Sequence, residues 1–242
     1  MPLDRAEILG VKVDSLTMSQ AVEKVQQLID ENKNALVATA NAEMLMRATT
    51  DEELKNILNN ADLVVADGAG TVWAANYLGM PMPERVAGYD LAQELMKEAP
   101  VRGDRVYFFG SAPGVADKAR EKALELYPGI NIVGTRNGYF KAEDEPGIIA
   151  EIKAARPDIL LAALGVPKQE KWLSRHRLEL QVPVSIGVGG TFDVMAGIVK
   201  RAPLWMQRAK LEWLFRGLKQ PSRATRLIAL PKFVLKVIAS KK

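Results

Sequence analysis

The chain contains no cysteine, and its 242 residues include one histidine, His176. The absence of cysteine excludes disulfide bonds, thiolate metal sites and cysteine nucleophiles. A lone histidine argues against a multi-histidine metal centre and against a repeated histidine acid–base design. We therefore expect no metal site built from thiolates or from several histidines, and we interpret His176 as an exposed helix residue rather than a catalyst.

Long hydrophobic runs are also absent. No stretch reaches the length of about 18 apolar residues that a membrane-spanning helix needs. The most apolar late stretch, residues 227–239, is broken by Pro231, Lys232 and Lys236. The N-terminus has no cationic start followed by an apolar segment, so no signal peptide is expected. These features predict a cytoplasmic protein whose late apolar stretch lies on a membrane without crossing it.

Acidic residues are nearly missing from the end of the chain. Residues 200–242 hold twelve of the 33 Lys and Arg but one of the 29 acidic residues, Glu212, which leaves 21 basic and 28 acidic residues before them. The basic tail interleaves its charges with large apolar residues such as Trp205, Trp213 and Phe233. Basic and apolar side chains at helical spacing are typical of a surface that binds an anionic membrane. We predict a tail that is mobile in solution and helical on lipid.

Up to about residue 195, short β-rich runs alternate with amphipathic helical runs. Apolar runs predict strands at residues 7–9, 12–14, 36–39, 63–66, 106–110, 130–135, 159–163 and 184–187, the first two as a hairpin. Helices are predicted at residues 18–32, 42–59, 70–78, 89–99, 113–127, 145–155 and 168–180. After residue 202 the strands stop, and helices are predicted at 204–219 and again from 222, on either side of Pro221.

This order of elements predicts an α/β fold. Residues 1–195 would form a Rossmann-like parallel-sheet core with helices on both faces. Residues 196–242 would form a basic C-terminal helical appendage that docks on a membrane.

Polar or glycine-rich loops follow five of the predicted strands. In open parallel sheets, ligands bind beyond the carboxyl ends of the strands, and helix N-termini there favour phosphate. One such loop carries little weight, because glycine also serves tight turns, but five favour a nucleotide or a phosphorylated ligand. The chain has no Walker A motif and no strict G-x-G-x-x-G fingerprint, which argues against an ATPase and an NAD-dependent dehydrogenase.

Candidate polar side chains lie in the two loops that follow the strands predicted at residues 36–39 and 63–66. Asp67 follows an apolar run and precedes Gly68, so it is either a general base acting on a hydroxyl or a turn residue that accepts local N–H bonds. Thr39 and Asn41 either orient a sugar or cap the following helix. The residues themselves leave both interpretations open.

Each of the other candidates also allows two interpretations, one functional and one not. Gln169 is either a sugar contact or a first-turn helix residue. Arg85 either binds phosphate or pairs with Glu84 or Asp90. Arginines of the tail either bind a diphosphate or are attracted to anionic lipid headgroups. Their guanidinium groups suit a diphosphate because they bind phosphate in bidentate fashion and stay charged. The tail candidates are Arg216, Arg223 and Arg226.

Several stretches are distinctive in combination: residues 39–44, 61–70, 83–90 (PERVAGYD), 137–140 (NGYF), 163–172 (ALGVPKQEKW), 187–197 (GVGGTFDVMAG), 200–203 (KRAP), 211–216 (LEWLFR) and 230–233 (LPKF). Together they resemble the WecG/TagA/CpsF glycosyltransferase family, and its TagA branch most closely, over residues 9–233. Ala40 and Ala66 stand where the family commonly has proline. Both changes affect the backbone and leave the polar groups in place.

The resemblance implies an inverting glycosyltransferase that makes the linkage unit of wall teichoic acid and needs no metal and no cofactor. It would move N-acetylmannosamine from UDP-ManNAc to the 4-hydroxyl of GlcNAc on undecaprenyl diphosphate. Asp67 would be the base, and Thr39, Asn41 and Gln169 would lie in the substrate site. The tail arginines would complete the active site at the membrane and replace a metal in stabilising the departing UDP.

The glycine-rich loops and the resemblance together give the expected binding partners. The donor nucleotide sugar is assigned to Arg85, Gly110, Ser111, Tyr139, Gly165, Lys168 and Gly189. The acceptor is undecaprenyl-diphosphate-GlcNAc, and the inner face of the cell membrane offers the anionic surface on which the protein is peripherally bound. Self-association into a homo-oligomer in solution is a further hypothesis. No nucleic acid is expected.

Three alternatives remain at this stage. The same fold could transfer N-acetylmannosaminuronic acid or glucose to another lipid-linked sugar. A non-catalytic scaffold docked on a membrane would also use the basic tail. A nucleic-acid-binding protein would use it to contact phosphates, but the acidic body and the apolar residues of the tail argue against this.

Overall fold

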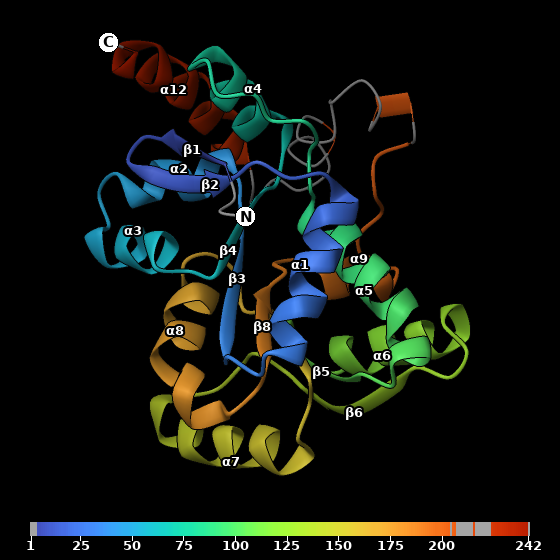
Figure 1. Ribbon diagram of the computed structural model, residues 1–242. Helices are drawn as coiled ribbons and strands as arrows, with labels where there is room; N and C mark the ends of the chain where they lie inside the picture. The colour runs from blue at the N-terminus through green and yellow to red at the C-terminus, as the bar shows by residue number, and fades with distance from the viewer. Residues whose placement is uncertain (1–3, 204, 207–214, 216–223, 242) are drawn as a thin grey trace.

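The computed structural model describes residues 4–203, 205–206, 215 and 224–241. Within these residues a parallel sheet of six strands runs in the order β4-β3-β8-β7-β5-β6, and a separate antiparallel hairpin pairs β1 with β2. The predicted α/β fold is therefore confirmed (Figure 1). The strands are β1 (Arg5–Ile8), β2 (Val11–Asp14), β3 (Ala35–Ala40), β4 (Leu63–Ala66), β5 (Arg105–Gly110), β6 (Asn131–Arg136), β7 (Ile159–Ala163) and β8 (Val184–Gly187).

Helices cover both faces of the large sheet, which is why its central strands are mostly apolar. Every residue of β3, β4, β7 and β8 is buried. Successive side chains of a strand point to opposite faces, so Leu36 and Ala38 join one apolar cluster and Val37 joins the other.

The helices divide between the same two clusters. With the hairpin and the first cluster lie α2 (Ala42–Ala48), α3 (Glu52–Asn59), α4 (Ala69–Tyr77), α7 (Glu145–Ala155) and α8 (Lys168–Leu180). With the second lie α1 (Met18–Asp30), α5 (Gly88–Arg102), α6 (Val115–Leu126) and α9 (Thr191–Met195). A short 3-10 turn, η1 (Ala142–Asp144), precedes α7.

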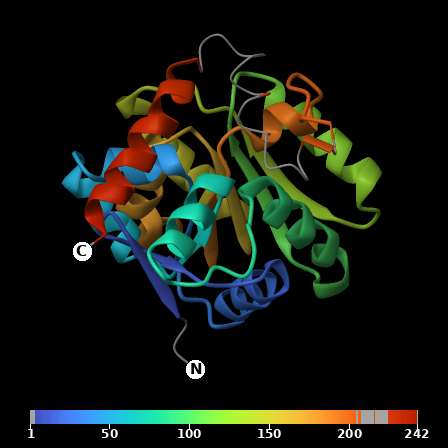
Figure 2. The same cartoon turned by 90° about the horizontal axis from the view of Figure 1, so that it is seen from above.

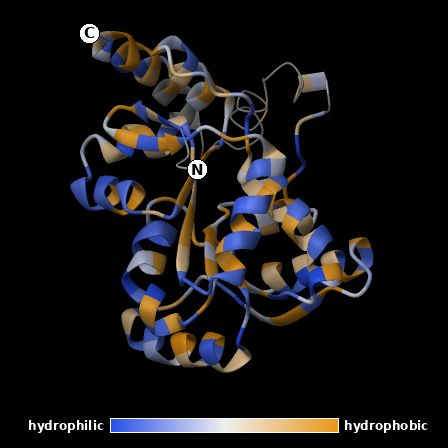
Figure 3. Ribbon diagram, viewed as in Figure 1, coloured by the Kyte–Doolittle hydropathy of each residue, from blue (hydrophilic) through white to orange (hydrophobic). Residues whose placement is uncertain are grey.

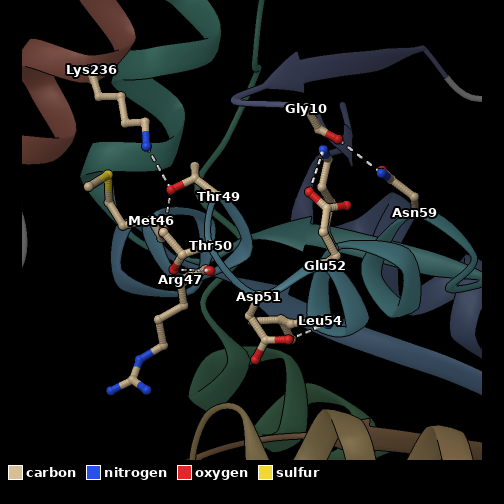
Figure 4. Close-up of polar contacts among 11 residues, drawn as sticks. Gly10, Met46, Arg47, Thr49, Thr50, Asp51, Glu52, Leu54, Asn59 and Lys236 are labelled. Atoms are coloured by element: carbon tan, nitrogen blue, oxygen red, sulfur yellow. Dashed lines mark hydrogen bonds and ion pairs between the residues drawn. The ribbon is translucent and has the colours of Figure 1, made fainter.

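The single helix predicted over residues 42–59 is wrong, because the structure divides it into α2 and α3. The hydroxyls of Thr49 and Thr50 donate to backbone carbonyls of the preceding turn, at 2.7 and 3.2 Å, and so compete with the helical hydrogen bonds. Asp51 then caps α3 by accepting from the backbone N–H of Leu54 at 3.0 Å (Figure 4).

The end of the basic tail forms a helix, α12 (Ala224–Ser240), which packs against α2 and α4 (Figures 1 and 2). Phe233 and Val237 are fully buried in the first cluster. Gly70 of α4 lies next to this helix, since a Cβ there would be in van der Waals contact with a side-chain carbon of Leu230, at 3.4 Å. The Lys236 ammonium donates to the Thr49 hydroxyl at 2.8 Å (Figure 4).

The opposite stripe of α12 faces solvent, with Leu235 67% and Ile238 45% exposed, and apolar and hydrophilic residues mix along the helix (Figure 3). The sequence predicted a tail that becomes helical on lipid, whereas the structure shows its last helix formed and packed on the core. The predicted helix at residues 204–219 lies almost wholly outside the described residues, and the division at residue 195 stays a prediction. Within the described part of the chain, no helix combines the length and apolar character needed to cross a bilayer.

Candidate active site

The carboxyl ends of the six parallel strands meet at one edge of the sheet, and the order of the strands places a crevice there. From β5 the chain moves outward to β6, whereas from β7 it moves in the opposite direction to β8. Adjacent strands whose connections diverge in this way leave the crevice in which ligands of doubly wound sheets bind. Gly110 ends β5 and Ser111 follows it, and Gly165 and Lys168 follow β7, so these predicted donor residues flank the crevice.

The loop after β5 is held tightly against β7. Gly110 has a φ of +133°, and a Cβ there would lie 2.4 Å from the carbonyl oxygen of Ala163. The Ser111 backbone N–H donates to that carbonyl at 2.9 Å, and its buried Oγ has no hydrogen-bond partner among the described residues. The loop after β5 therefore has a fixed backbone, and it carries one buried hydroxyl without a hydrogen-bond partner among the described residues.

The segment after β6 folds onto the same loop. The Gly138 N–H donates to the Ser111 carbonyl at 2.9 Å. From α8, the Lys168 ammonium donates to the Gly138 carbonyl at 3.2 Å and lies 4.0 Å from the centre of the Phe140 ring. Tyr139 is 74% exposed beside them. The structure thus brings the loops after β5, β6 and β7 together, and their binding of the donor stays a prediction.

Gln169 lies in the first turn of α8, and its side chain is buried. Its Oε1 accepts from the backbone N–H groups of Gly165 at 3.1 Å and Gly189 at 3.2 Å, and its Nε2 donates to Oε1 of Glu170 at 2.8 Å. Gln169 therefore cross-links the loops after β7 and β8. Its predicted contact with a sugar stays a prediction.

The side chains of Thr39 and Asn41 both make hydrogen bonds to the backbone at the end of β3. Thr39 is 5% exposed, and its hydroxyl donates to the Gly187 carbonyl at 2.9 Å. Asn41 caps α2 by accepting from the Met44 N–H at 3.0 Å. The capping interpretation is confirmed for Asn41 and wrong for Thr39, whose hydroxyl links β3 to β8 instead. The roles of both residues toward substrate stay predictions.

Asp67 lies at the mouth of the sheet, where its position after β4 predicted it. It is partly buried, and its backbone N–H donates to the Ala40 carbonyl at 2.9 Å. Gly68, with φ +105°, makes the sharp turn into α4. Because β3 and β4 are neighbours, Asp67 lies beside the loop that carries Asn41.

Arg85 pairs with Asp90 at 3.5 Å, one of the partners that the sequence suggested. Asp90 also binds Arg201 at 2.7 Å, and the Arg201 guanidinium lies 4.5 Å from the centre of the Tyr89 ring. Sequence reasoning missed this link between α5 and the segment that leads into the tail. Its signal was an arginine inside the KRAP stretch.

His176 is not an exposed residue, and that prediction is wrong. Its side chain is 13% exposed, its Nε2 lies 3.0 Å from a carboxylate oxygen of Glu145, and its ring lies 5.0 Å from that of Trp172. The turn of α8 that carries His176 packs against α7, and this packing could not be read from the polar neighbours in the sequence.

Most of the predicted tail arginines lie outside the part of the chain that the structure describes. Arg216 and Arg223 lie outside the described residues, and Arg226 lies in α12 with an undescribed side chain. In the described part of the chain, no group of three or more His, Cys, Asp or Glu residues could hold a metal ion. The expectation of a reaction without metal stays a prediction.

Comparisons with known proteins cover both the core and the tail. The model of the glycosyl transferase WecG/TagA/CpsF family matches residues 6–242. An N-acetylglucosaminyldiphosphoundecaprenol N-acetyl-beta-D-mannosaminyltransferase of Bacillus spizizenii is 38% identical over 210 residues, 87% of this chain and 81% of the relative. A protein of the same name from Staphylococcus aureus strain MW2 is 34% identical over 240 residues, 98% of this chain and 94% of the relative.

Proposed function

The chain belongs to the WecG/TagA/CpsF family of glycosyltransferases, and we propose that it transfers N-acetylmannosamine from UDP-ManNAc to the 4-hydroxyl of GlcNAc on undecaprenyl diphosphate. The product would be the linkage unit of wall teichoic acid. The observation that carries this proposal is the similarity, across nearly the whole chain, to two transferases named for that acceptor and that sugar. The arrangement of the carboxyl edge of the sheet supports it.

On the acceptor side, Asp67 is the proposed general base. An inverting transfer needs one group to take the proton of the attacking hydroxyl while the sugar leaves from the opposite side. The backbone of Asp67 is anchored to β3, and its partly buried position at the sheet edge gives a carboxylate in a fixed place. Asn41, on the neighbouring loop, is anchored as the cap of α2.

On the donor side, the crevice between β5 and β7 is proposed to hold the UDP moiety. Its walls are the loop at Ser111, the segment at Gly138 and the N-terminus of α8, where backbone N–H groups favour phosphate. The exposed Lys168 adds a positive charge at this end of the helix.

The tail is proposed to stabilise the departing UDP. α12 packs against α4 near Gly70, three residues after Asp67, and Arg226 lies one helical turn before Leu230, which makes that contact. Arginines of the tail that reach the diphosphate would neutralise the charge that develops on it, so we propose a reaction that needs no metal. We also propose that the tail binds the anionic inner face of the membrane, where the lipid acceptor lies.

The test is release of UDP from UDP-ManNAc with a soluble lipid-diphosphate-GlcNAc analogue. Asp67→Ala and Asp67→Asn are expected to lower kcat by about 10²- to 10⁴-fold, the range for loss of a general base. The matched control is Asp30→Asn, which changes a carboxylate that is 64% exposed and paired with Arg102 at the end of α1. EDTA is expected to leave the rate unchanged. Full activity of both Asp67 variants would overturn the assignment of the base.

The tail arginines call for single substitutions rather than truncation. A chain ending at Lys200 would also lose Phe233 and Val237 and would expose the core against which they pack. Arg216→Ala, Arg223→Ala and Arg226→Ala are each expected to lower kcat by about 10²-fold or more. The control Lys232→Ala removes an exposed charge of α12. If the arginine variants lose binding to anionic vesicles but keep kcat on the soluble acceptor, the arginines are anchors only.

Other donors separate the remaining alternatives. Turnover of a UDP-uronate or of UDP-glucose, with UDP-ManNAc inert, would move the assignment to another transfer within the family. An Asp67→Ala variant that keeps full function in cells would favour a scaffold. Sedimentation of the full chain tests whether it self-associates.

A further inference from the structure

Two adjacent polar side chains are buried at the start of α8. Gln169 and Glu170 are each 1% exposed, and both lie directly after Lys168, a predicted donor residue. The sequence showed only the first turn of a helix, in which polar residues normally face solvent. Burial of an amide and a carboxyl side by side calls for a structural or functional reason.

The carboxyl of Glu170 settles which way the Gln169 amide points. An ionised carboxylate can only accept hydrogen bonds, so the NH₂ group of the amide must face it, as it does at 2.8 Å. The amide oxygen is thereby turned to the N–H groups of Gly165 and Gly189. The reversed amide would set its oxygen against the carboxylate and its NH₂ group against two N–H donors.

The pair also lies close to the end of β8. A Cβ on Gly187 would lie 2.6 Å from Nε2 of Gln169 and 3.0 Å from Oε1 of Glu170, so only glycine fits there. Gly187 in turn accepts the hydroxyl bond of Thr39. The chain of contacts therefore runs from β3 across β8 to the first turn of α8, under the loops of the proposed donor site.

No charged side chain competes for Glu170 among the described residues of the elements packed against α8. β3, β7 and β8 carry none in their strands. On the helices, Lys171 pairs with Asp51 and Glu53 of α3, and His176 pairs with Glu145 of α7. Burial raises the pKa of Glu170 to about 7, against the lowering effects of the Gln169 amide and a backbone N–H. Its Oε2 has no hydrogen-bond partner in the described part of the chain.

We propose that Glu170 is a positioning residue for the donor site: its carboxylate orients the Gln169 amide, and the amide oxygen holds the loops after β7 and β8 together for binding of the nucleoside diphosphate. This inference rests on the proposed function for the identity of the ligand. Glu170 acts through Gln169 and does not touch the reacting atoms.

The test exchanges donor and acceptor between the two positions. Glu170→Gln replaces the carboxylate beside the Gln169 amide with a neutral group that can accept or donate, so that only the two glycine N–H groups still orient the amide. Gln169→Glu sets two carboxylates against each other. The double variant Gln169→Glu, Glu170→Gln restores the pattern, because the carboxylate introduced at position 169 accepts both glycine N–H groups and the amide introduced at position 170 donates to that carboxylate. Glu179→Gln, an exposed carboxylate of the same helix, is the matched control.

The measurement is the Kd of UDP by calorimetry, with KM for UDP-ManNAc and kcat alongside. We expect Glu170→Gln to weaken UDP binding about tenfold at pH 8, Gln169→Glu to weaken it further, and the double variant to return within about threefold of wild type. The acceptor KM should not change. Wild-type UDP affinity should fall as the pH drops below about 7, and affinity of Glu170→Gln should not.

Two results would overturn the inference: a double variant no better than the worse single variant, or a wild-type chain that does not bind UDP. Thermal unfolding identifies variants that merely fail to fold, and the double variant then decides between the interpretations. Wild type that binds UDP but turns over no UDP-ManNAc would refute the proposed reaction while the UDP affinities still test Glu170.

Discussion

Replacement of Glu170 by glutamine should stabilise the protein, and the gain should depend on pH. Burial raises the pKa of the Glu170 carboxyl from 4.5 to about 7, so the folded state holds its proton more tightly than the unfolded state does. Between those two pH values the folded chain binds more protons, and stability falls as the pH rises. Glutamine is neutral throughout and carries no such cost.

The magnitude follows from the two pKa values. Each pH unit between them is worth about 1.4 kcal/mol, which gives about 3 kcal/mol for the whole interval. Between pH 5 and pH 8 the free energy of unfolding of wild type relative to Glu170→Gln should fall by about 2.5 kcal/mol. Burial also raises the pKa of Asp104, and its contribution cancels because both proteins carry it.

The assay is urea unfolding of both proteins at pH 5 and pH 8. Glu143→Gln, which alters a carboxylate with 72% of its side chain exposed, is the control and should keep the pH dependence of wild type. A stability difference between wild type and Glu170→Gln that is equal at the two pH values would refute the reasoning. With the expected result, the charged Glu170 would lower stability at the pH at which it orients Gln169, a trade of stability for function.

Three further changes test the packing around the site, each by chemical denaturation. Phe233→Ala should lower the free energy of unfolding by about 3–5 kcal/mol, because this ring of α12 is fully buried against the core. Leu235→Ala, at a side chain of the same helix that is 67% exposed, should lower it by less than about 0.5 kcal/mol. Equal losses would mean that α12 does not pack as described. Gly110→Ala should destabilise far more than Gly114→Ala, since both glycines have positive φ but only the first would press a Cβ on the backbone at the end of β7. Thr39→Val should cost about 1–3 kcal/mol by leaving the carbonyl at the end of β8 unpaired; an unchanged stability would show that this bond contributes nothing.

Local patterns predicted the core well. Unbroken apolar runs gave the strands within a residue or two, and the loops after them gave the edge at which Asp67, Ser111 and Gly165 lie. Apolar periodicity did not predict the break between α2 and α3. Threonine hydroxyls there donate hydrogen bonds to backbone carbonyls one turn earlier and so compete with the helical hydrogen bonds, and the spacing of apolar residues carries no information about this competition. The start of α2 after Asn41 was predicted, and the capping role of Asp51 follows from residue type and could have marked the start of α3.

By itself the sequence determined the α/β class, the polar edge of the sheet, the contrast between acidic body and basic tail, and the family, because these depend on composition, periodicity and motifs along the chain. Only the tertiary structure decided that Asp90 joins Arg85 to Arg201, that Phe233 closes the core, and that Gln169 and Glu170 lie buried between two loops. Such contacts join residues far apart in the chain, and burial of a polar side chain depends on what packs over it. The first turn of α8 is buried because β8 and the glycine loop after it pack against this turn, and the sequence of α8 alone does not show that packing.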